Sequence, residues 1–177
     1  FSNNTYRHIQ NNSSNCVWVL VDSMVKRKLA SSKYHERVKE CNNAIQIIKQ
    51  ITRQEVNFNN ISNKELSILS ESDPIGYNRA KHIIGENDRV RRMEEAISNN
   101  DLNEIGKILT QSHKSLRDFY DVSCVEIDYL IDTSSKFKGW FGGRIMGGGF
   151  GGNTINLIKE GNEIKYSQYI KNGCTWR

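Results

Sequence analysis

The sequence has few cysteines, a single proline and no long apolar run. A run of about 18 apolar residues is needed for a membrane-spanning helix, so we expect no membrane partner. The four cysteines are far apart, which excludes the C-x-x-C spacing of zinc ribbons: Cys16, Cys41, Cys124 and Cys174. We therefore expect free thiols in a reducing compartment, the cytoplasm, with neither a metal site nor a disulfide framework.

The N-terminal residues also lack two common features. Residues 1–15 contain no apolar signal-peptide core, and Phe1 stands where an initiator methionine is usual. Apolar residues make up 37% of the chain and come in periodic groups. We expect a polar arm over residues 1–15, one folded domain over residues 16–177, and a longer protein of which this chain is a part.

Basic residues exceed acidic ones, giving a net charge of +5. They cluster in VKRK (Val25–Lys28) and DRVRR (Asp88–Arg92), and the second cluster is followed by two glutamates that partly balance it. The clusters are interpreted as solvated charged faces, with an anion-steering surface as the alternative. The sequence shows no aromatic-basic platform and no recognition-helix motif, so we expect no nucleic-acid partner.

Four segments repeat apolar residues every three or four positions, which is the spacing of one helix face. They are residues 31–51, residues from Pro74 to about 98, residues 102–120 and residues 125–137. Asp73 before Pro74 fits a helix cap, and Asp101 with Glu104 and Ser123 with Glu126 fit the capping-box spacing. Residues 52–71 are polar and remain ambiguous.

Other segments are typical of strands. They are Cys16–Ser23, Gly139–Met146, residues 153–160 and, as a last strand, residues 164–170. The order is therefore one strand, four helices and further strands. That order predicts an α+β fold, an antiparallel sheet with helices packed on one face.

Five of the 13 glycines lie in MGGGFGG, Met146–Gly152. Gly147, Gly149 and Gly152 match the G-x-G-x-x-G fingerprint, but a strand instead of a helix is expected to follow, which excludes a dinucleotide site. No Gly-Lys-Ser/Thr follows, which excludes a Walker A loop. Two interpretations stay open: a tight turn needed only for packing, or a loop that a ligand or another chain approaches closely.

Four segments stand in unbroken order along residues 16–158. They are VLVDSMVKRKLASSKYHERVKEC (Val19–Cys41), RAKHIIGENDRV (Arg79–Val90), SHKSLRDFYDVSC (Ser112–Cys124) and RIMGGGFGG (Arg144–Gly152). Together they resemble the C-terminal domain of galactokinases, within the GHMP kinase family. The last segment resembles the family's third conserved motif. Asp22, His35, Ile145 and Met146 depart from the residues usual in galactokinases.

The resemblance implies a ferredoxin-like α+β domain of an ATP:sugar 1-phosphotransferase, which phosphorylates galactose at its anomeric hydroxyl with ATP and Mg²⁺. Tyr34 falls on the tyrosine that contacts the sugar. The motif lining the ATP/sugar cleft falls on Gly147, Gly148, Gly149, Phe150, Gly151 and Gly152. The phosphate loop, the catalytic aspartate and the Mg²⁺ ligands belong to the family's N-terminal half, a partner we expect to lie outside this sequence. This chain alone then has no catalytic residue and no kinase activity.

Several alternatives remain at this point. The resemblance also fits a non-catalytic sensor of sugar and ATP, or a kinase of N-acetylgalactosamine. Tyr34 begins a helical apolar stripe, so core packing would also explain it. His113 is interpreted as structural, and Arg144 as holding either a carboxylate or the glycine loop.

Overall fold

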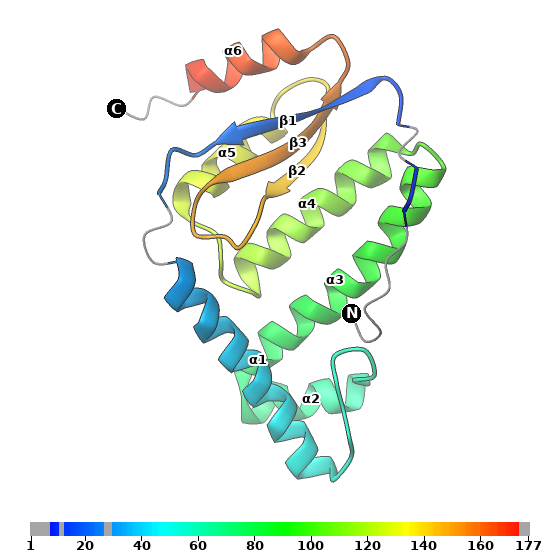
Figure 1. Cartoon of the computed structure of the whole chain (residues 1–177), viewed down its shortest axis with the longest axis vertical. Coiled ribbons are helices and arrows are strands. Elements are labelled where there is room, and N and C mark those ends of the chain that lie inside the picture. The colour runs from blue at the N-terminus through cyan, green and yellow to red at the C-terminus, as the bar shows by residue number, and fades with distance from the viewer. Residues whose placement is uncertain (1–7, 11–12, 27–29, 174–177) are drawn as a thin grey trace.

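The computed structural model describes residues 8–10, 13–26 and 30–173 (Figure 1). In chain order the elements are β1 (Cys16–Asp22), α1 (Ala30–Thr52), α2 (Asn63–Ser72), α3 (Pro74–Ser98), α4 (Leu102–Asp118), α5 (Val125–Ser135), β2 (Trp140–Ile145), β3 (Asn153–Lys159) and α6 (Glu163–Gly173). The α+β class and the antiparallel sheet are confirmed. In the described ranges, no helix is long and apolar enough to cross a membrane.

The sheet has the strand order β1-β3-β2, and both pairs are antiparallel. Leu157 of β3 is fully buried and packs with apolar residues of α4, among them Ile105 and Leu109. Helix and strand approach most closely where Gly106 of α4 faces Gly142 of β2, since a Cβ on Gly142 would lie 1.9 Å from the Gly106 carbonyl oxygen. Two glycines therefore let α4 lie directly on this face of the sheet.

The prediction of a last strand is wrong, because residues 164–170 form part of helix α6. Tyr166 and Ile170, four residues apart, are buried against Ile158 of β3 and Leu130 of α5. Ile164, which strand alternation would bury with Tyr166, is 75% exposed. Helices α5 and α6 consequently reach the face of the sheet opposite to α4, and Figure 1 shows α6 on the side of the sheet away from α4.

Helices α1 and α2 and the first part of α3 form a helical extension away from the sheet (Figure 1). Its own core contains Ala44, Ile48, Val56, Leu69 and Ala80. Helix α2 lies in the segment left ambiguous by the sequence. It begins with a capping box, in which the side chain of Ser62 accepts from the amide of Glu65 and the Glu65 carboxylate accepts from the amide of Ser62.

Two of the expected helix caps are confirmed and one is wrong. Asp73 and Asp101 accept hydrogen bonds from the amides of Gly76 and Glu104, but the Glu104 carboxylate pairs with Arg92, so only the Asp101 half of the expected capping box is present. The N-cap residue of α5 is Cys124, which makes no side-chain cap hydrogen bond. The Ser123 hydroxyl instead donates to the Asp128 carboxylate.

The described cysteines Cys16, Cys41 and Cys124 are free thiols, and burial raises the pKa of each. Cys174 lies outside the described residues.

Candidate functional site at the glycine-rich loop

The glycine-rich loop, residues 146–152, connects β2 to β3. Gly147, Gly149, Gly151 and Gly152 all have positive φ, and so does Phe150. The Phe150 amide donates to the Val122 carbonyl at 2.7 Å, and the Gly152 amide donates to the Val25 carbonyl at 3.2 Å. The loop is therefore held at two points by segments far away in the sequence, which a simple hairpin turn does not need.

The glycines of this loop divide into two kinds. A Cβ on Gly149 would lie 2.3 Å from the Val122 carbonyl oxygen, and a Cβ on Gly151 would lie 2.7 Å from that of Val25. At Gly148 a Cβ would meet nothing within 4 Å. The buried glycines are required by packing, whereas the exposed backbone of Gly147 and Gly148 leaves room for a ligand to approach.

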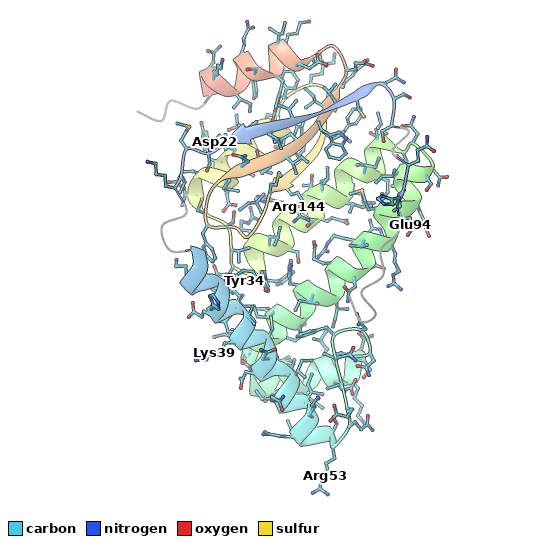
Figure 2. The ribbon with its side chains drawn as sticks, viewed as in Figure 1. Asp22, Tyr34, Lys39, Arg53, Glu94 and Arg144 are labelled. Atoms are coloured by element: carbon cyan, nitrogen blue, oxygen red, sulfur yellow. The ribbon has the colours of Figure 1, made fainter. Side chains whose placement is uncertain are left out.

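Tyr34 lies at the end of α1 that points toward the sheet and its loop (Figure 2). Its side chain is 46% exposed, so core packing does not account for this residue. The neighbouring Lys33 places its Nζ 5.2 Å from the centre of the Phe150 ring, a cation–π contact. The structure thus brings the start of α1 and the glycine-rich loop together, although more than a hundred residues separate them.

Arg144 binds a carboxylate and its own strand. Its Nη1 donates to Ser112 Oγ at 2.9 Å and lies 3.5 Å from Glu86 Oε2, and its Nε donates to the Ile145 carbonyl. Glu86 also accepts from Ser112 and Arg89. Arg144 therefore ties the end of β2, where the loop begins, to helices α3 and α4.

A row of polar contacts joins α3 to α4 and the turn after it. Arg79 donates to the Phe119 carbonyl, His82 Nδ1 lies 2.9 Å from Ser115 Oγ, and Ser112 donates to Glu86 at 2.9 Å. No role was predicted for these side chains from the sequence. The sequence did contain a signal for them, because both sides of the row lie in segments that resemble galactokinases, Arg79–Val90 and Ser112–Cys124.

His82 should make the stability of the chain depend on pH. Burial lowers its pKa from 6.5 to about 4, although the nearby Glu86 raises it. Because the unfolded chain binds the extra proton first, stability is complete above pH 6.5 and is lost as the pH falls toward 4. We expect a loss of up to about 3 kcal/mol.

The measurement is urea unfolding at several pH values between neutral and mildly acidic. The variant His82→Phe should flatten the pH dependence of stability, because it removes the titrating imidazole. It keeps a ring that can stack on Tyr120, whose ring centre lies 4.5 Å from that of His82. Replacing the exposed His35 by glutamine is the matched comparison for the loss of a histidine. An equally steep loss of stability in His82→Phe would contradict this assignment.

His113 is buried, at 2% exposure, and its Nε2 lies 3.3 Å from Asp128 Oδ1. This contact places it in the interior between α4 and α5, as expected of a structural histidine. Within the described ranges no group of three or more His, Cys, Asp or Glu side chains could hold a metal ion.

Comparisons with known proteins indicate the family of this domain. Residues 93–167 match the family model described as GHMP kinases C terminal. The chain is 37% identical to a galactokinase of Thermosipho africanus over 153 residues, and 36% identical to one of Clostridium acetobutylicum over 156 residues. Each match covers 86% of this chain, but only 42% and 40% of the relatives, so the chain spans about two-fifths of their length.

Solved structures show the same relation. A crystal structure of Lactococcus lactis galactokinase complexed with galactose matches 96% of this chain and 44% of that protein, with a TM-score of 0.86 and 29% identity. A mevalonate kinase of L. major in complex with R-mevalonate has a TM-score of 0.51 and 21% identity, which shows the shared fold alone. The chain therefore contains a GHMP kinase C-terminal domain of the galactokinase type.

Proposed function

We propose that this chain is the C-terminal part of a sugar kinase that transfers the γ-phosphoryl group of ATP to the anomeric hydroxyl of galactose. The observation that carries the proposal is the glycine-rich loop, whose Gly147 and Gly148 are exposed and whose Phe150 ring lies 5.2 Å from Nζ of Lys33, the residue before Tyr34. Two relatives named galactokinase and a structural match that covers nearly the whole chain support the same assignment.

Phosphoryl transfer needs mainly positioning and stabilisation of charge. In the proposed enzyme, the Tyr34 hydroxyl hydrogen-bonds the sugar from the start of α1. The exposed backbone of Gly147 and Gly148 shapes the wall of the cleft without side chains in the way. Mg²⁺, when bound with ATP, neutralises phosphate charge, and we assign its ligands and the catalytic base to the N-terminal half of the kinase.

The test is a chimera in which this chain replaces the matching segment of the Thermosipho africanus galactokinase. ADP release is measured by a coupled assay with MgATP and galactose, and with N-acetylgalactosamine and R-mevalonate in parallel. We expect turnover of galactose by the chimera and none by the isolated chain. Turnover by the isolated chain, or a folded chimera that prefers another substrate, would sink the proposal.

Tyr34→Phe should weaken galactose binding in this chimera. A neutral hydrogen bond contributes about 0.5–1.5 kcal/mol, so the KM for galactose should rise about 2- to 12-fold while that for ATP stays nearly unchanged. Stability should hardly change, because the side chain is half exposed and the ring is kept.

Tyr129→Phe is the matched control for this change. It removes a hydroxyl that donates to the Gly173 carbonyl at 2.7 Å, which is a bond between α5 and α6 and not a contact with the loop. The control should leave both KM values unchanged. An unaltered galactose KM in Tyr34→Phe would remove Tyr34 from the sugar site.

A further inference from the structure

Two arginines are buried side by side between α1 and α3. Arg37 and Arg79 are each 7% exposed, and both bind the carboxylate of Glu40. Arg37 Nη1 lies 2.8 Å from Glu40 Oε1, and Arg79 Nε lies 2.6 Å from Glu40 Oε2. Burial by itself raises the pKa of the Glu40 carboxyl, but the two guanidinium groups outweigh it and hold that pKa below its ordinary value.

The other ends of both guanidinium groups reach the turn between α4 and α5. Arg37 Nη2 lies 2.7 Å from Asp121 Oδ2, and Arg37 Nε donates to the Asp121 carbonyl at 3.3 Å. Arg79 Nη1 donates to the Phe119 carbonyl. Asp121 has a φ of 55°, so this turn holds a left-handed residue that tertiary contacts must stabilise.

The next residue of this turn touches the glycine-rich loop. Val122 accepts the hydrogen bond from the Phe150 amide at 2.7 Å, and its carbonyl oxygen is the atom that a Cβ on Gly149 would strike. Val122 is itself buried, and its amide donates to the Leu116 carbonyl at 3.1 Å. A continuous set of contacts therefore leads from the two arginines through Phe119–Val122 to the loop.

We propose that Arg37 and Arg79 are positioning residues that hold the Phe119–Val122 turn, and through it set the conformation of the glycine-rich loop at Gly149 and Phe150. Neither arginine touches the loop directly in any contact described above. A guanidinium group suits this role, because its planar set of donors binds a carboxylate and a carbonyl at the same time, which a lysine cannot reproduce. The catalytic consequence rests on the proposed function, whereas the structural consequence does not.

Amide hydrogen exchange of the whole chain, followed by NMR, tests the structural consequence. In Arg37→Gln we expect the Phe150 amide to exchange about tenfold faster, since local opening of the turn frees its acceptor. The Gly152 amide should change less, because its acceptor is Val25 and not the turn. Arg92→Gln is the matched control: it removes an α3–α4 ion pair, 2.6 Å from Glu104, that does not contact the turn.

The exchange of buried sheet amides such as that of Leu157 reports any general loss of stability. If Phe150 accelerates only in proportion to those amides, or not at all, the proposal is overturned. Should Arg37→Gln fail to fold, Asp121→Asn weakens the same contact at an exposed carboxylate and keeps a residue that tolerates positive φ. A selective acceleration at Phe150 in that variant supports the proposal, and its absence overturns it.

The chimera distinguishes this inference from the proposed function. There, Arg37→Gln should lower kcat about fivefold or more, and Arg92→Gln should leave it within about twofold. Arg37→Lys should restore part of the kcat, since it keeps the charge but not the double contact. A Phe150 amide that accelerates without any change in kcat would support the positioning of the loop and count against the loop's proposed part in catalysis.

Discussion

Replacing Gly149 by valine should lower the galactokinase activity of the chimera by about 100-fold or more, because a misplacement of a cleft wall by about 1 Å has effects of that size. A side chain at this position would begin 2.3 Å from the Val122 carbonyl oxygen and 2.6 Å from the Val122 Cβ. The φ of 86° is also strained for a β-branched residue. The loop must therefore leave its position, and the hydrogen bond from Phe150 to Val122 is lost with it.

Gly148→Val is the control for stability alone, since a Cβ at Gly148 meets nothing within 4 Å but the residue lies in the proposed wall of the cleft. The thermal stability of the isolated chain should be nearly unaffected by the control and lowered by Gly149→Val. In the chimera, the kcat of Gly149→Val should fall far more than a loss of folded protein would explain. If Gly149→Val keeps near-normal activity, the loop is a passive turn and carries no part of the site.

Gly106→Ala should destabilise the chain by about 3 kcal/mol or more, although alanine is the better helix former. A Cβ at Gly106 would lie 2.0 Å from the Phe141 carbonyl oxygen and 2.3 Å from its carbonyl carbon. Backbone atoms of a paired strand cannot move aside as a flexible side chain can. Helix α4 must then lift off the sheet, and the buried contacts of Ile105, Leu109 and Leu157 are weakened.

The matched control is Gly85→Ala, in helix α3. There a Cβ would lie 3.0 Å from the end of the Arg89 side chain, which can shift. Helix propensity favours the control by about 0.5–1 kcal/mol, so its stability should be equal to or above that of the unchanged chain. Chemical denaturation of the three proteins gives the comparison. A Gly106→Ala chain as stable as the control would show that the close approach of α4 to β2 is not required.

Local signals in the sequence were enough to predict most helices and strands. The cap residues Asp73 and Asp101 act on amides within three positions, so their effect can be seen in the sequence itself. The apolar run of β1 and the alternating residues of β3 are likewise local patterns that predict strands. The family motifs added the identity of the glycine-rich loop, which composition alone left open between a turn and a site.

Short runs and single polar side chains were not decided locally. The run of residues 164–170 fits a strand or a helix about equally well, and burial of Tyr166 and Ile170 against α5 and β3 selects the helix. Ser123 had the spacing of a capping box, but its hydroxyl bonds Asp128 instead. In the first case the deciding partners lie in α5 and β3. In the second case the partner, Asp128, lies five residues further along the chain, within α5.

The sequence by itself determined that the glycine-rich loop is free to adopt positive φ, since glycine places no steric limit there. Only the tertiary structure decided which conformation the loop takes, because Val122 and Val25 accept its amides and leave no space for a Cβ at Gly149 or Gly151. Arg37 and Arg79 show the same division. Their charge is written in the sequence, but their burial against one glutamate and one turn arises only when α1, α3 and the end of α4 pack together.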